Sequence, residues 1–288
     1  IRFEDPELEA SIRSAVKHTV GNLTEDELFS VTALTLSGRT VKNLEGLESL
    51  GNLEELEITA SKATPAPANL SVIAQLGNLK RLRFVNLQLK PSDLLPLANL
   101  VQLEELTLIN TQLARLDELA GLSGLKKLDF SRNQVQNISF LWGMREMKEL
   151  NFSANQVSEV TTLSRLERLR VLSFAGNRVV ELLPLRSLTL LEELDFSDNQ
   201  VRQIGVLAEL ANLGILYFAG NQVEDLVPLS GLDQLYLLNC DNNQIRQIGP
   251  LLEMDGLLSA SLKENPLDQE ALEVQIPALK EKRVRVLQ

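Results

Sequence analysis

Few residues of this sequence have the side chains that catalysis needs. The only histidine is His18, which we expect on the surface of a helix near the front of the chain, and the only cysteine is Cys240. We therefore expect no histidine-based triad and no metal site with two or more imidazole ligands. One cysteine also excludes an intramolecular disulfide.

Two pairs of carboxylates, Glu192 with Glu193 and Asp195 with Asp198, have the residue types that general acid and base catalysis uses. On an open surface they would be solvated, and their pKa values would have little reason to shift. The sequence contains no glycine-rich phosphate loop, no G-x-S-x-G and no H-E-x-x-H. We predict a non-enzymatic protein with no cofactor and no metal.

The composition narrows the class of partner. The formal net charge is -11 and the pI is about 4.8, and no basic stripe is present, so we expect no nucleic-acid partner. No apolar run approaches the roughly 18 residues of a membrane span, so we expect no direct membrane insertion. Aromatic residues make up only 4%, which predicts an aliphatic core.

The elements that position any site come from a repeat of 22 residues, most visible in a column of asparagines. The column consists of Asn133, Asn155, Asn177, Asn199, Asn221, Asn243 and Asn265. Around each asparagine the pattern reads L-x-x-L-x-F-x-x-N-x-V, and its L-x-F step is the alternation of a short strand. We expect leucine, phenylalanine and valine to point inward and each asparagine to bond the backbone of adjacent coils. Cys240 replaces phenylalanine in this pattern, so we interpret it as a small buried residue and not as a nucleophile.

The same register extends to the front of the chain and predicts eleven strands. The first four lie around Leu34, Leu56, Leu82 and Leu106, and there the spacing loosens to 22, 26 and 24 residues. In these coils the asparagine position holds other residues, namely Arg39, Ser61, Leu87 and Thr111. The 26-residue coil contains the Pro/Ala-rich segment 62–68, which we expect to form a solvated loop that cannot pair as a strand, or else a contact loop.

Both ends of the repeat carry predicted caps, which stacked coils need to cover their apolar faces. Asp5 followed by Pro6 predicts the start of a helix, and Thr24 to Glu27 reads as a capping box that opens a second one. At the other end we expect a helix beginning at 268–271 and a final edge strand around Val284 and Val286.

The repeat resembles that of bacterial leucine-rich-repeat proteins related to the internalins. Residues 221–232 read N-Q-V-E-D-L-V-P-L-S-G-L, which is similar to the internalin coil N-Q-I-x-D-I-x-P-L-x-x-L. Residues 3–9 with Gly46, Leu47 and Glu48 resemble the helical front cap, and 265–267 followed by 276–279 resembles the closing segment. The chain departs from the pattern in having phenylalanine where internalins more often have leucine, and in its irregular early coils.

The resemblance implies an α/β solenoid of the leucine-rich-repeat horseshoe type, with about eleven parallel strands on the concave face and short 3-10 turns on the convex face. We expect a single domain over 1–288, divided into a helical N-terminal cap (1–30), coils (31–265) and a helix-plus-strand C-terminal cap (266–288). It also implies a surface or secreted recognition module that binds on its concave side.

Columns of residues at the repeat spacing predict which side chains face a partner on the concave side. A group of exposed apolar residues is expected in the last third of the chain, from Val171, Ile215, Tyr217 and Leu237 with Tyr236 at its rim. A second column directly follows the asparagines and includes Gln134, Gln156, Arg178, Gln200 and Gln222. Charged columns of mixed sign, among them Asp195, favour a protein over a polyanion as partner. As an alternative to binding a partner, the apolar side chains pack only on one another. The glutamines have the alternative explanation that this residue type is common in such repeats.

We therefore predict a monomer that binds another protein and is extracellular or at the cell surface. One alternative is a cytoplasmic scaffold or regulatory subunit, favoured by the lone cysteine. Another is binding of a glycan or of the cell wall along the glutamine column. Trp142 is expected on the convex side, either packed on Phe140 and Met144 or forming a second contact site.

Overall fold

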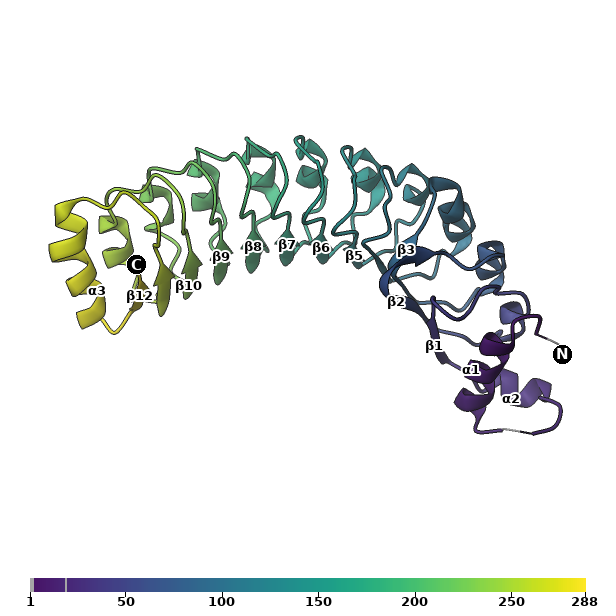
Figure 1. The fold of residues 1–288 in the computed structure, drawn as a ribbon. Helices are drawn as coiled ribbons and strands as arrows, with labels where there is room; N and C mark the ends of the chain where they lie inside the picture. The colour runs from purple at the N-terminus through teal and green to yellow at the C-terminus, as the bar shows by residue number, and fades with distance from the viewer. Residues whose placement is uncertain (1–2, 19) are drawn as a thin grey trace. The chain divides into compact units, whose positions relative to one another are not determined.

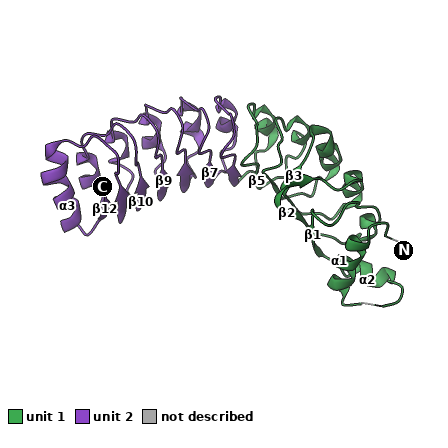
Figure 2. Cartoon of the chain, viewed as in Figure 1, with its two compact units in different colours: residues 1–147 green, residues 148–288 purple. Residues whose placement is uncertain are grey.

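A computed structural model describes residues 3–18 and 20–288 of the chain (Figure 1). Residues 1, 2 and 19, which the sequence assigns to the front cap, lie outside the described residues. The chain falls into two compact units, unit 1 (1–147) and unit 2 (148–288) (Figure 2). The division into one domain with boundaries at 30 and 265 stays a prediction.

Unit 1 contains the front cap and the first five strands. The cap consists of helices α1 (Pro6–Val16) and α2 (Glu25–Phe29). Parallel strands follow in chain order: β1 (Ala33–Ser37), β2 (Glu55–Pro65), β3 (Arg81–Gln88), β4 (Glu105–Ile109) and β5 (Lys127–Asp129). Short 3-10 turns lie on the other side of the coils, at Leu47–Ser49, Leu70–Gln75, Pro91–Asn99, Asp117–Leu119 and Ser139–Gly143 (Figure 1).

Unit 2 contains the regular coils and the closing cap. Its strands are β6 (Glu149–Asn151), β7 (Val171–Ser173), β8 (Glu193–Asp195), β9 (Ile215–Tyr217), β10 (Leu237–Asn239) and β11 (Ser259–Ser261). Its 3-10 turns are Thr161–Arg165, Leu183–Ser187, Gly205–Glu209, Val227–Leu229 and Gly249–Glu253. A π-helical turn (Ala271–Gln275) leads into α3 (Ile276–Glu281), and β12 (Arg285–Leu287) pairs parallel with β11. The predicted strand positions, 3-10 turns, caps and edge strand are confirmed.

The inward column of each strand forms the core. Leu172, Leu194 and Leu216 have no exposed surface, and each lies opposite the next in the parallel register. Beside them the phenylalanines of successive coils form a stack, with Phe174 and Phe196 centroids 6.0 Å apart and Phe196 and Phe218 centroids 5.5 Å apart. The strands begin 22 residues apart in the chain, and burying the same apolar residue type at each repeat position fixes the register in which they pair.

The asparagine column connects the coils as predicted. Asn199 Nδ2 donates to the carbonyl of Phe174 in the preceding coil at 3.1 Å and to that of Phe196 at 3.0 Å. Its Oδ1 accepts from the backbone N–H of Val179 at 2.9 Å. Asn221 repeats the arrangement one coil later. Each amide thus satisfies backbone groups at the bend after the strand that would otherwise be buried without partners.

In the irregular early coils a different pair of asparagines bridges the strands. Asn110 Nδ2 donates to Asn86 Oδ1 at 2.7 Å, and Asn86 Nδ2 donates to the carbonyl of Ala60 at 2.6 Å. Asn86 and Asn110 have positive φ, 59° and 53° respectively, a conformation that asparagine tolerates better than most residues. They lie one position before Leu87 and Thr111, so these coils keep a bridging amide at a shifted position.

The expectation that segment 62–68 cannot pair as a strand is wrong. Strand β2 continues to Pro65, and after an irregularity between Thr59 and Thr64 it pairs with Leu87 and Gln88 of β3. The bulge takes up the extra residues, and proline is tolerated because it ends the strand. Beyond it, the Ala68 N–H donates to the carbonyl of Lys42 at 2.8 Å, so the first coil holds the end of this segment.

Candidate functional site

The strand face of unit 2 presents two rows of side chains on either side of the buried leucine column. Strand pairing places residues of the first face row opposite one another: Glu149, Val171, Glu193, Ile215, Leu237, Ser259 and Arg285. The second face row consists of Asn151, Ser173, Asp195, Tyr217, Asn239, Ser261 and Leu287. Because neighbouring parallel strands lie about 4.8 Å apart, residues in one row form a continuous surface.

Four predicted apolar residues lie on these rows, and strand pairing brings three of them together. Ile215 and Leu237 are opposite each other in the first face row, with Tyr217 of the same strand as Ile215 in the second. Val171 is in the first row too, separated from Ile215 by Glu193. All four are half-buried.

Tyr236 flanks the first face row, as predicted, and lies against the preceding coil. It is 43% exposed, and its N–H donates to the carbonyl of Gly214 at 3.0 Å. One coil later the corresponding position holds Leu258, which is 65% exposed. The prediction from the sequence omitted Leu258, although its spacing of 22 residues from Tyr236 was the signal that could have found it. We call Ile215, Tyr217, Tyr236, Leu237 and Leu258 the apolar patch.

Carboxylates border the apolar patch on one side. Partial burial raises the pKa of the Tyr217 phenol, and the negative charges of Glu193 and Asp195 add to this effect. The phenol therefore stays protonated over the whole physiological range and can donate a hydrogen bond.

Asp195 has a structural contact of its own. Its Oδ1 accepts from the backbone N–H of Ser197 at 3.0 Å, which closes the turn after β8. Asn239 does the same for Asp241 after β10, at 3.0 Å. Aspartate and asparagine favour such local turns, so the residue types at these two positions are explained by the repeat.

The glutamine column lies beyond the ends of the strands. Each of its members follows a bend whose residue has positive φ, such as Gly176, Asp198 or Gly220. The backbone N–H groups of Arg178, Gln200 and Gln222 donate to the preceding coil's valine carbonyls at 2.8, 2.9 and 2.9 Å. Gln156 belongs to unit 2 as well, whereas Gln134 belongs to unit 1. Within unit 2 the column therefore forms a row separate from the two face rows, and Gln222 Oε1 accepts from Arg202 Nε at 2.8 Å.

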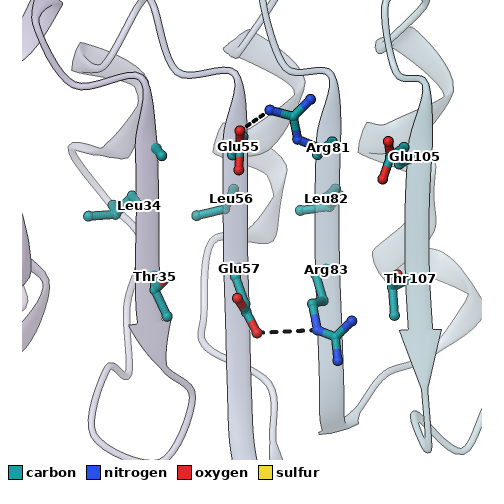
Figure 3. Close-up of a pocket in the computed structure, with 11 residues that line it drawn as sticks. Leu34, Thr35, Glu55, Leu56, Glu57, Arg81, Leu82, Arg83, Glu105 and Thr107 are labelled. Atoms are coloured by element: carbon teal, nitrogen blue, oxygen red, sulfur yellow. Dashed lines mark hydrogen bonds and ion pairs between the residues drawn. The ribbon is translucent and has the colours of Figure 1, made fainter.

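The strand face of unit 1 is charged (Figure 3). Glu57 Oε1 lies 3.2 Å from Arg83 Nε across β2 and β3, and Glu55 pairs with Arg81 beside it. These side chains line a shallow depression of about 190 Å³. Since cross-strand pairs of opposite charge neutralise each other, these pairs make the surface polar without giving it a net charge of their own.

The sequence also singles out His18, Cys240 and Trp142, which lie away from the apolar patch. His18 lies just beyond α1 and not within it, with Nδ1 2.6 Å from Glu27 Oε1. Cys240 is fully buried, its Sγ lies 3.3 Å from the carbonyl of Ser261, and burial raises the pKa of its thiol. Trp142 is 52% exposed in a 3-10 turn of unit 1.

Among the described residues, no group of three or more histidines, cysteines and carboxylates could hold a metal ion. None of the described helices has the length and apolar character needed to cross a membrane.

Comparisons with known proteins agree with this architecture. Residues 3–133 match the family model of the leucine-rich-repeat domain of the endo-β-N-acetylglucosaminidase EndoS. The comparison with curated protein sequences gave no match.

Three solved structures are similar to the chain. An internalin from Listeria monocytogenes is 25% identical, with a TM-score of 0.85 over 99% of this chain and 88% of that one. Internalin C2 from the same organism is 24% identical, with a TM-score of 0.56 over 91% of this chain and 94% of that one. A plant peptide hormone receptor, solved in complex with RGF2, is 18% identical, with a TM-score of 0.62 over 76% of this chain and 41% of that one. The repeat, the two caps and these likenesses agree, and the chain has a leucine-rich-repeat fold that is similar to that of the internalins.

Proposed function

We propose that the chain recognises another protein through the strand face of unit 2, as a non-catalytic module. The observation that carries this proposal is the apolar patch, in which half-buried Ile215, Tyr217 and Leu237 adjoin the exposed Tyr236 and Leu258. Aromatic and aliphatic side chains gathered on a surface and bordered by polar groups are typical of the centre of a protein interface.

Two further observations support a protein as the ligand. Charged side chains of both signs on the strand face of unit 1 neutralise each other, which disfavours a polyanion. Leucine-rich repeats commonly serve protein recognition, and the similar plant receptor was solved in complex with RGF2.

We further propose that the protein acts at the bacterial surface or after secretion, which the likeness to two Listeria internalins supports. Fractionation of the native source tests this part. Recovery with the cell surface or the medium is expected, whereas recovery with the cytosol would favour a scaffold or regulatory subunit.

Affinity capture with the intact chain, followed by measurement of the affinity for the captured protein, tests the recognition site. The double substitution of Tyr217→Ala and Leu237→Ala should weaken binding tenfold or more. A matched control replaces Leu183 and Val227, which are 62% and 61% exposed in the 3-10 turns of the same unit. Unchanged affinity after the first pair of substitutions, or an equal loss after the second, would exclude the strand face as the site.

Glycan binding is the outcome that would replace this proposal. It would appear as a signal on a glycan array that is lost when Gln134 and Gln156 are changed to alanine.

A further inference from the structure

Glu193 stands out among the acidic groups of the strand faces. It lies in the first face row between two apolar neighbours, Val171 and Ile215, and is half-buried. Within the described part of the chain it makes no ion pair. Glu192, the adjacent residue, is paired with Arg170, so Arg170 is already engaged.

The strand face of unit 1 provides the contrast. There Glu55 and Glu57 of β2, and Glu54 just before it, are each paired with a cation in or next to β3. Adjacent strands of the repeat can therefore carry a cation opposite a carboxylate. Opposite Glu193, however, the neighbouring strands carry only Val171 and Ile215.

The charges on the two face rows beside Ile215 and Tyr217 are both negative. Asp195 is the neighbour of Glu193 in the second face row, and one backbone N–H, that of Ser197, contacts its carboxylate. On β7 to β10 the two face rows contain no lysine or arginine, and the first cation along the first face row is Arg285 on β12. The electric field at the β8 side of the patch, beside Ile215 and Tyr217, therefore attracts cations.

We infer that the partner segment recognised by the apolar patch carries a lysine or arginine beside an apolar side chain, so that the apolar group covers Ile215 and Leu237 while the cation pairs with Glu193. This inference rests on the proposed function and specifies the chemistry of the partner.

The spacing of the strands makes the match geometrically simple. Glu193 is one strand from Ile215 and two from Leu237, which corresponds to about 5 and about 10 Å. A partner helix places side chains three or four residues apart at about 5–6 Å. An extended partner segment places residues i and i+2 on one face about 7 Å apart. Both can present an apolar residue and a cation at the required distance.

Desolvation gives the pairing its selectivity. A partner that covered the patch with apolar groups alone would bury the Glu193 carboxylate without a counter-charge, which is unfavourable. A partner with an acidic side chain at this point would add like-charge repulsion. The patch should therefore discriminate against both classes and select the basic one.

Selection from a library of displayed random peptides of about 12 residues tests the inference, and it does not require that the natural partner be identified first. Peptides selected on the intact chain should be enriched in lysine and arginine close to leucine, phenylalanine or tyrosine. Their affinity should fall tenfold or more for Glu193→Lys, and a second selection on that variant should enrich acidic peptides. Glu193→Gln should give an intermediate loss.

Glu253→Lys is the matched control, since it makes the same charge change at an exposed position in a 3-10 turn of the same unit. Circular dichroism melts confirm that each variant is folded. Peptides that lose affinity with Tyr217→Ala and Leu237→Ala but are indifferent to Glu193→Lys would overturn the inference and leave the proposed site standing. Peptides indifferent to both changes would overturn the proposed site itself. Concentration-dependent self-association that masks the patch would identify a second copy of the chain as its occupant, and would also overturn the inference.

Discussion

The ring of Tyr236 lies over the α-carbon of Gly214, which is the residue 22 positions earlier in the preceding coil. A β-carbon on Gly214 would lie 2.8 Å from Tyr236 Cε1, too close for the ring to stay in place. The absence of a side chain at Gly214 therefore sets the orientation of an exposed aromatic residue at the rim of the apolar patch.

Gly214→Ala should displace the Tyr236 ring at little cost in stability. The ring is partly exposed and can rotate into solvent, and replacing glycine reduces the entropy of the unfolded chain by an amount worth about 0.4–1 kcal/mol. We expect a change of less than about 1 kcal/mol in urea unfolding, together with a several-fold loss of affinity for peptides selected on the intact chain. Gly231→Ala, where a β-carbon would meet nothing within 4 Å, should raise stability by up to about 1 kcal/mol and leave the affinity for the peptides unchanged. Retained peptide affinity in Gly214→Ala would remove Tyr236 from the interface.

Asn199→Ala should be strongly destabilising. The substitution deprives the Val179 N–H of its acceptor and the Phe174 and Phe196 carbonyls of their donor. A buried polar group left unsatisfied costs about 1–3 kcal/mol, so we expect a loss of at least about 3 kcal/mol in urea unfolding. Asn212→Ala removes one exposed bond to the carbonyl of Thr189 and should cost less than about 1 kcal/mol. Equal losses in the two variants would contradict a special role for the column.

The regular coils could be predicted from the sequence because each repeat position carries a single physical requirement. Leu194 is buried, Phe196 stacks on its neighbours and Asn199 bonds the backbone, and the same residue types recur at these positions every 22 residues. A pattern with that many repetitions determines the strand, the bend and the face on which each side chain lies.

The exceptions arise where the requirement is met by a different residue. In the early coils the bridging amide moves to Asn86 and Asn110, one position before the column, so alignment by the asparagine column does not detect it. Segment 62–68 pairs through a bulge in β2, which composition alone does not predict. The charge pattern predicts Asp195 on the partner surface, yet its turn-closing bond to Ser197 accounts for its residue type. Periodicity identifies which residues are exposed, but it does not separate contacts that serve the repeat from side chains left for a partner.

Acidification should loosen the front cap through Asp5. Burial would raise the pKa of this carboxyl, but hydrogen bonds from the backbone N–H groups of Lys42, Leu8, Asn43 and Glu7 outweigh it and hold the pKa below its usual value. A depressed pKa in the folded state means that the stabilisation is complete above the unfolded value of about 3.9 and is lost as pH falls through the folded value. Urea unfolding should therefore show stability that declines below about pH 4.

Asp5→Asn separates this titration from the other carboxylates. The amide can still accept from Glu7 and Leu8, but its NH₂ group would face the N–H groups of Lys42 and Asn43, which now lack an acceptor. We expect a loss of about 1–3 kcal/mol at pH 7 and a smaller difference from the unmodified chain at pH 3. A difference that is the same at both pH values would show that the Asp5 charge does not stabilise the cap.

Cys240 should be unreactive towards thiol reagents until its coil opens. Its side chain has no exposed surface, and burial raises the pKa of the thiol, so the reactive thiolate is absent in the folded state. Labelling with 5,5′-dithiobis(2-nitrobenzoate) should therefore be slow in buffer and rapid in denaturing urea. Because stacked coils contribute nearest-neighbour stability, the labelling rate in buffer reports local opening around β10. Asn243→Ala, which removes the bond to the Cys240 carbonyl at 3.1 Å, should accelerate labelling tenfold or more, whereas Asn212→Ala should leave it unchanged. Rapid labelling of the intact chain would show that this part of the repeat opens without the cost that a continuous asparagine column imposes.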